Sequence, residues 1–262
     1  MTDQISQGAD APDSLIERFV ADGYVRIDGA FPRSIADDCR TMLWQASGCS
    51  PEDPGTWTHP VVRLPGSAEP PFRAAAASPS LTAAYDTLVG PGAWHPMAGL
   101  GTFPIRFPSD QDPGDDGWHI DAGFGWETEP DFMQWRVNAA SRGRALLALF
   151  LFSDVGDHDA PTRIRIGSHT TIAQFLTPFG EPGATIAELA ADGFAETAHH
   201  TEAFATGNAG TVYLCHPFLV HAAQRHRGTT PKFMAQPPLI PTFPAGPPTD
   251  SIVMRSVANG PG

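Results

Sequence analysis

Prolines and glycines spread along the whole chain are the feature that most restricts how it can fold. The 262 residues include 27 prolines and 26 glycines. Proline lacks a backbone N–H and glycine weakens the interior of a helix, so this density disfavours long helices. It favours short strands that are joined by turns and loops. With 41% apolar residues, the chain is long enough for one sizeable core.

The expected elements follow from periodicity and from capping residues. Helices are expected to begin near Ser14, Ser34 and Ser80, where a hydroxyl precedes apolar residues at helical spacing. A capping box of Thr185 and Glu188 predicts another helix over residues 185–193. After about residue 100 the pattern favours strands. The expected strands cover residues 101–107, 117–122, 145–153, 162–166, 210–221 and 231–237.

The order of these elements predicts a mainly β protein with flanking helices. We expect a flexible N-terminal tail over residues 1–13 and a single domain over residues 14–245, in which residues 47–71 form a loop. Residues 246–262 are expected to form a C-terminal tail with a short helix that ends at Gly260.

Charge and cysteine content restrict the classes of partner and location. The formal net charge is −13, and such an acidic surface repels phosphate backbones, so nucleic acid is not expected as a partner. The three cysteines match no disulfide framework or zinc site. The N-terminal residues lack the pattern of a signal peptide, and the longest apolar run, residues 145–152, is too short to cross a bilayer. These features predict a cytoplasmic monomer or homodimer that contacts no membrane.

The sequence WHID places His119 and Asp121 two residues apart. In a strand, side chains at this spacing project from the same face. An imidazole and a carboxylate are two of the three ligands in the facial triad of non-haem Fe(II) oxygenases. Taken alone, the pair is also compatible with an ordinary strand that carries a surface histidine.

Residues 210–239 offer three candidates for the third ligand. Pro217 has no N–H to donate and is expected to break the strand. His216 and His221 differ by five residues, so a regular strand would place them on opposite faces, with only one facing inward. His226 lies in the polar sequence QRHRG and is expected to face solvent, as are the arginines on either side of it.

Several segments together resemble the phytanoyl-CoA dioxygenase family of Fe(II)- and 2-oxoglutarate-dependent oxygenases. These segments are WHID, HPFLVHAA, RIRIGSH and the N-terminal FVADGYVRIDGAFP. The resemblance covers roughly residues 14–245. It implies a double-stranded β-helix core of the jelly-roll or cupin-like type. It also implies that His119, Asp121 and His221 bind Fe(II), with 2-oxoglutarate and O₂ as cosubstrates. His216 and His169 are then expected to be structural.

The resemblance also implies where 2-oxoglutarate binds. The family usually has an arginine eleven residues after the distal histidine, where it pairs with the far carboxylate of 2-oxoglutarate, but here that residue is Lys232. Lysine can neutralise a carboxylate, although it lacks the bidentate geometry of arginine. Thr102 and Arg106, on the expected strand before the WHID segment, are further candidates for contacts with this cosubstrate.

Four residues near the expected metal strand are candidates for substrate binding. Arg163 and Arg165 share one face of a strand, where they form either a clamp for an acidic substrate or a solvated surface. Trp118 and Trp126 lie on either side of His119 and Asp121 in the sequence and are suited either to a pocket wall or to the core.

The resemblance implies hydroxylation of an unactivated C–H bond of a small molecule, with release of succinate and CO₂. The composition, rich in alanine, glycine and proline, suggests a role in bacterial specialised metabolism. Asp121 disfavours halogenation, because related halogenases replace this carboxylate with a small residue. Desaturation, epimerisation or other oxidative chemistry at the same iron is an alternative. A second alternative is a non-catalytic barrel that acts as a binding or regulatory module, and Lys232 is the residue that favours it.

Overall fold

The strand β5 (Leu146–Leu151) lies at the centre of the molecule and is buried on both faces. The computed structural model describes residues 12–258. Alternate residues of β5 belong to different hydrophobic clusters, with Leu146, Ala148 and Phe150 on one side and Leu147, Leu149 and Leu151 on the other. Side chains alternate between the faces of a strand, so an unbroken apolar run is what a strand covered on both faces requires.

Two antiparallel sheets enclose the second of these clusters. The larger sheet has the order β1-β9-β5-β11, with β12 also paired to β5, and the smaller sheet has the order β10-β6-β8. Their other strands are β1 (Tyr24–Ile27), β6 (Thr162–Arg165), β8 (Glu202–Ala205), β9 (Val212–Cys215), β10 (His221–Ala222), β11 (Met234–Ala235) and β12 (Pro238–Leu239). Leu149 from the larger sheet and Ile164 from the smaller sheet belong to the same buried cluster, so the two sheets face each other.

Two further strand pairs extend this framework. They are β2 (Val61–Leu64) with β3 (Phe103–Arg106), and β4 (Arg136–Val137) with β7 (Ala184–Thr185). Arg106 at the end of β3 pairs with Lys232 through two backbone hydrogen bonds of 2.9 and 3.0 Å. This pairing joins β3 to the segment that leads into β11.

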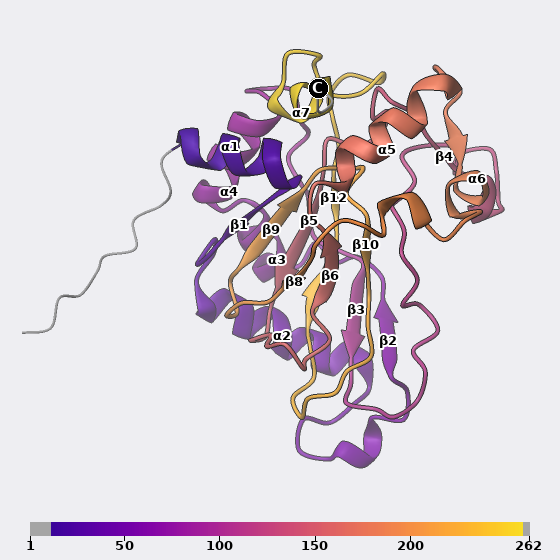
Figure 1. Cartoon of the computed structure of the whole chain (residues 1–262). Helices are drawn as coiled ribbons and strands as arrows, with labels where there is room; N and C mark the ends of the chain where they lie inside the picture. Colours follow the sequence, from indigo (N-terminus) through magenta and orange to yellow (C-terminus); the bar gives the residue numbers. More distant parts are fainter. Residues whose placement is uncertain (1–11, 259–262) are drawn as a thin grey trace, which may run out of the picture.

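Helices cover the outer face of the larger sheet (Figure 1). The helices are α1 (Pro12–Asp22), α2 (Arg33–Ser47), α3 (Pro70–Ala76), α4 (Pro79–Leu88), α5 (Ser168–Leu176), α6 (Ile186–Ala190) and α7 (Ile252–Ala258). Short 3-10 helices lie at Pro54–Thr56, Phe132–Gln134, Thr177–Phe179 and Ala195–Thr197. Phe19 of α1, Tyr85 of α4 and Val253 of α7 are fully buried in the cluster next to β5. Helices α5 and α6 contribute to a third cluster, which includes Ile120 from the WHID segment.

Mainly β architecture with flanking helices agrees with the fold class expected from the sequence. The capping box of Thr185 and Glu188 is present at the start of α6. The expected strands at 101–107, 145–153 and 162–166 correspond to β3, β5 and β6. The helices expected near Ser34 and Ser80 begin one residue earlier, and the helix expected at Ser14 begins at Pro12.

Other expected elements are wrong, for identifiable reasons. Residues 117–122 form no named strand, because only His119 makes a bridge to a neighbour. The expected strand 210–221 is divided into β9 and β10 by a turn at residues 216–219, where Pro217 interrupts the pairing. Helix α3 begins at Pro70, inside the expected loop, and α5 follows the GSH turn, where no helix was expected.

The expected terminal features fall largely beyond the described residues. Residues 1–11 of the expected N-terminal tail and Gly260, the expected helix end, lie outside residues 12–258. Between residues 12 and 258, the structure contains no helix with the length and hydrophobicity needed to cross a membrane.

Candidate metal centre

His119 and His221 are held side by side by their own backbones. The N–H of His119 donates to the carbonyl of His221 at 2.9 Å, and the N–H of His221 donates to the carbonyl of His119 at 3.0 Å. Their ring centroids are 4.4 Å apart. Asp121 follows His119 by two residues, and one ligand atom from each of the three side chains lies within 4.8 Å of the others. The structure therefore brings together the three residues that the sequence proposed as metal ligands.

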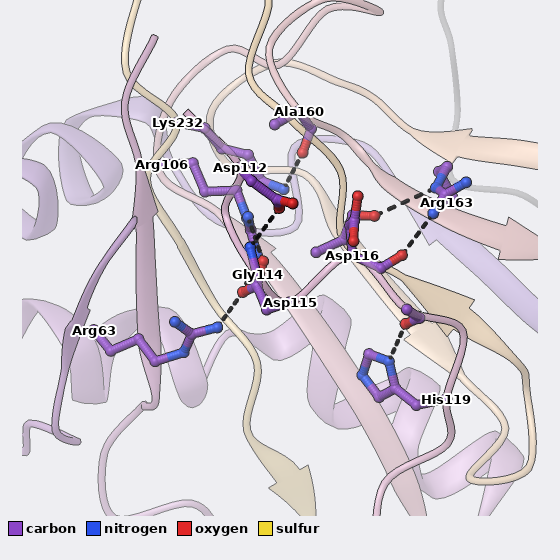
Figure 2. A network of polar contacts seen from close by, with 12 residues as sticks. Arg63, Arg106, Asp112, Gly114, Asp115, Asp116, His119, Ala160, Arg163 and Lys232 are labelled. Carbon is purple, nitrogen blue, oxygen red and sulfur yellow. Dashed lines mark hydrogen bonds and ion pairs between the residues drawn. The ribbon is translucent and has the colours of Figure 1, made fainter. Parts of the chain in front are cut away.

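Both imidazoles present the same nitrogen to this centre. The Nδ1 of His119 lies 2.9 Å from the carbonyl oxygen of Gly117, and the Nδ1 of His221 lies 3.0 Å from that of Leu219. Figure 2 shows the first of these contacts. Because a carbonyl oxygen can only accept, each Nδ1 carries the proton and each Nε2 keeps its lone pair. A second hydrogen bond of this kind is what orients a histidine ligand at a metal.

The electrostatic surroundings keep Asp121 and His221 in the protonation states that bind a metal. Burial alone would raise the pKa of Asp121, but the positive charge of Arg144 and the adjacent imidazoles outweigh it, and the pKa lies below its ordinary value. The Nη1 of Arg144 lies 3.3 Å from the Oδ2 of Asp121. Burial, and next the neighbouring His119, lower the pKa of His221 to about 4. Asp121 is therefore a carboxylate and His221 a neutral imidazole at neutral pH.

The GSH turn fixes the backbone just before His221. Gly167 has φ of 78°, in the left-handed region that favours glycine, and it precedes the first residue of α5. The hydroxyl of Ser168 accepts a hydrogen bond of 2.9 Å from the N–H of Val220, and Ser168 is fully buried. The motif thus positions a metal-ligand candidate through the backbone of the preceding residue.

The other histidines of this region lie away from the triad and are buried among structural contacts. His216 is fully buried, accepts from the N–H of Phe218 through Nδ1 and lies 3.2 Å from the carbonyl of Val253 through Nε2. The ring of His169 lies 5.2 Å from it. The expected solvent exposure of His226 is wrong, because only 4% of it is exposed and its ring binds Thr230 and Gly228 in a tight turn. Its neighbours Arg225 and Arg227 are exposed, as expected.

Lys232 and Arg106 form a buried cationic pair (Figure 2). The ammonium of Lys232 donates to the carbonyl of Ala160 at 2.6 Å, and its residue is 1% exposed. The guanidinium of Arg106 forms two hydrogen bonds with Asp115, at 2.6 and 3.0 Å, and Arg63 also pairs with this carboxylate. Burial, and then the nearby charge of Arg106, lower the pKa of Lys232 well below its ordinary value. Two buried basic side chains therefore share a single close carboxylate among the described residues.

The arginines proposed to clamp a substrate are engaged with a tryptophan. The guanidinium carbons of Arg163 and Arg165 lie 4.5 and 4.1 Å from the ring centroid of Trp118. Arg163 donates to the carbonyl of Asp116, and Arg165 to the hydroxyl of Thr197 and to a nearby carbonyl. Trp126 stands apart from this stack, with 43% of its surface exposed.

A cavity of about 740 Å³ opens beside Asp121. It is lined by the segments 66–68, 95–102 and 236–238, together with Asp121, Arg144 and Ile240. Thr102 lines this cavity, whereas Lys232 and Arg106 do not. Arg144 was missed by the sequence analysis. It directly precedes the apolar run of β5, but nothing in its local sequence distinguishes it from a residue that flanks a strand.

The donor set suits a divalent transition metal. Two imidazole nitrogens and one carboxylate form the facial triad that non-haem Fe(II) enzymes use, with adjacent coordination positions left for other ligands. Within residues 12–258 no other group of histidine, cysteine and carboxylate side chains converges in this way.

The fold of this protein is similar to the folds of several solved structures. No protein-family model and no curated protein matches the sequence. Solved structures do match. SnoN, a non-haem α-ketoglutarate-dependent epimerase from nogalamycin biosynthesis, aligns with a TM-score of 0.54 and 15% identity over 90% of this chain and 86% of its own. HygX from Streptomyces hygroscopicus, solved with nickel and 2-oxoglutarate bound, aligns with a TM-score of 0.55 and 18% identity, covering 88% and 87%.

The fold is shared. AviO1 from Streptomyces viridochromogenes aligns over 92% of this chain and 99% of its own, with a TM-score of 0.54 and 14% identity. The likeness therefore extends over most of the chain, and identities this low establish only the fold.

Proposed function

We propose that this protein is a non-haem iron oxygenase that uses 2-oxoglutarate and O₂ to oxidise a C–H bond of a small molecule. The observation that carries the proposal is the convergence of His119, Asp121 and His221, with both Nε2 atoms available, beside a cavity. Support comes from the shared fold, because HygX was solved with 2-oxoglutarate and metal. We further propose that the two facing sheets form a double-stranded β-helix of the phytanoyl-CoA dioxygenase type.

Each group of residues has a distinct role in this proposal. His119, Asp121 and His221 would hold Fe(II), which supplies the oxidative chemistry when it is bound together with 2-oxoglutarate and O₂. Lys232 and Arg106 would neutralise the far carboxylate of 2-oxoglutarate, because they form the buried cationic pair that lacks a full set of counter-charges. The contacts of Arg163 and Arg165 with the ring of Trp118 would brace the WHID segment and keep water from the ligands.

Hydroxylation is the outcome that we propose, with succinate and CO₂ as coproducts. Epimerisation is the second candidate, because SnoN is described as an epimerase and has the same fold. The two outcomes differ in product mass, since hydroxylation adds one oxygen atom whereas epimerisation leaves the mass unchanged.

Anaerobic titration with Fe(II) and 2-oxoglutarate tests the proposed class. A weak charge-transfer band in the visible is expected for the wild-type protein and should be lost in His221→Ala. His216→Ala should retain the band in protein whose circular dichroism is native, and His199→Ala, at an exposed histidine, serves as a matched control. Absence of the band in the wild-type protein, together with no succinate in the presence of O₂, would leave the non-catalytic barrel as the better description.

A further inference from the structure

The cavity beside Asp121 has the size and lining of a site for a small organic molecule. Its volume of about 740 Å³ falls within the range that drug-sized ligands occupy. Met97, Leu100, Pro237 and Ile240 give it apolar walls, while the exposed Thr102 and Gln236 offer polar contacts. A ligand that matches this lining would have a largely apolar body with a few hydrogen-bonding groups.

Arg144 lines this cavity and has hydrogen-bond donors that no described residue uses. Its Nε donates to the carbonyl of Ala122 at 2.7 Å, and its Nη1 lies 3.3 Å from the Oδ2 of Asp121. This Nη1 is buried and forms no hydrogen bond with the described residues. A guanidinium has five N–H donors, and among the described residues only the one on the Nε of Arg144 forms a hydrogen bond.

The charges that line the cavity do not balance once a metal is bound. Among the described residues that line it, Arg144 is the one lysine or arginine and Asp121 is the one carboxylate. A divalent ion held by Asp121 and two neutral imidazoles keeps one positive charge, and Arg144 adds a second. A near carboxylate of 2-oxoglutarate would offset the first of these charges, but the charge of Arg144 would remain.

We infer that Arg144 binds a carboxylate of the organic substrate, and that the substrate is an organic acid with a largely apolar body. This inference rests on the proposed function, since it assigns the substrate of the same site. Arginine suits the role because its planar fork can donate two parallel hydrogen bonds to a carboxylate. The far carboxylate of 2-oxoglutarate is assigned elsewhere, because Lys232 and Arg106 do not line this cavity.

A matched pair of probes tests the inference without turnover. The affinities of 4-fluorobenzoate and 4-fluorobenzamide, which have nearly the same shape but differ in charge, would be measured by ¹⁹F NMR on protein loaded with Zn(II) and 2-oxoglutarate. In the wild-type protein we expect the acid to bind about tenfold more tightly than the amide, as a charged hydrogen-bonded pair in a partly open cavity would give. Arg144→Gln should abolish this preference and leave the affinity for the amide unchanged, whereas Arg144→Lys should retain part of it.

Arg142→Gln is the control, because Arg142 is exposed, lies over the ring of Phe124 and does not line the cavity. It removes the same charge two residues away and should leave the preference intact. Equal binding of the two probes to the wild-type protein, or a preference that survives in Arg144→Gln, would overturn the inference. The inference would also be overturned if Arg144→Gln weakened the binding of 2-oxoglutarate instead, because Arg144 would then bind a carboxylate of the cosubstrate. Loss of the preference only through loss of Zn(II) would overturn it as well.

If the proposed function is wrong, the wild-type protein should bind neither Zn(II) nor 2-oxoglutarate. Both affinities are measured before the probes are added, so this result is distinguished from a failure of the inference about Arg144. The comparison of acid and amide on that metal-free protein would still report whether Arg144 recognises a carboxylate.

Discussion

Replacing Lys232 with methionine should make the folded protein more stable while weakening its binding of 2-oxoglutarate. Lys232 is 1% exposed and has a single hydrogen bond, to the carbonyl of Ala160. Its closest charged neighbours are Arg106, which repels it, and Asp115, which is already paired with two arginines. Methionine has nearly the same length and needs neither a proton nor a counter-charge in the core.

The expected size of the effect comes from two opposing contributions. Replacing a buried charged group by an apolar side chain of similar volume is often neutral or stabilises by about 1–4 kcal/mol. Loss of the hydrogen bond to Ala160 costs about 1 kcal/mol. We therefore expect Lys232→Met to raise the free energy of unfolding by about 2 kcal/mol at neutral pH, which corresponds to an increase in Tm of about 5 °C.

The pH dependence gives this prediction a second measurement. The pKa of Lys232 is lowered in the folded state, so between that pKa and its ordinary value of 10.5 the unfolded chain binds a proton that the folded protein does not. The stability contribution of the lysine therefore rises with pH through this window, and the advantage of Lys232→Met should shrink as the pH approaches 10.5. Urea unfolding at several pH values measures the difference.

Lys232→Arg provides the opposing control. Arginine cannot release its proton to adapt to burial, so this variant should be less stable than the wild-type protein in the absence of 2-oxoglutarate. For 2-oxoglutarate, the methionine variant should bind about 10–100-fold more weakly, because one partner of a buried ionic contact is removed. A methionine variant that is less stable than the wild-type protein by more than about 1 kcal/mol would refute the reasoning.

Further predictions concern backbone and side-chain positions outside the triad. Gly23→Ala should destabilise the protein by about 2–4 kcal/mol, because Gly23 has φ of 78° and an added Cβ would lie 2.5 Å from the ring of His169. Gly29→Ala, at φ of 59° with open space around it, should cost only the backbone strain. Equal losses of stability in thermal unfolding would contradict this reasoning. Ser168→Ala should cost about 1–3 kcal/mol by leaving the N–H of Val220 unpaired, and metal titration should show weaker binding than in the wild-type protein. Thr185→Ala should cost about 1 kcal/mol by removing the cap of α6, with no change in metal affinity, and a parallel loss of metal would count against the local role of the cap.

The sequence was most informative where neighbouring residues determine the outcome. The apolar run along residues 145–152 and the Thr185 capping box depend on local sequence, and both elements are present. Two-residue spacing and a resemblance led to the expectation that His119, Asp121 and His221 would share a site, and the structure places them together. Their binding of iron is still a prediction.

Features that depend on partners distant in the chain could not be read in this way. Residues 117–122 have an alternating pattern, yet the chain there makes only one bridge, because whether a segment joins a sheet depends on the edge it meets. The role of Arg144 depends on a carboxylate 23 positions earlier that folding brings to 3.3 Å. The burial of His226 depends on a tight turn that overrides its polar sequence neighbours.

The reciprocal backbone pairing of His119 and His221 also has a consequence for the thermodynamics of metal loading. The two residues are about 100 positions apart, and their peptide hydrogen bonds hold them side by side without a metal. The entropy of loop closure is therefore lost when the chain folds and not when a cation arrives. Chelation should then leave a folded apoprotein that reloads reversibly, unlike small zinc domains whose folding depends on their ion.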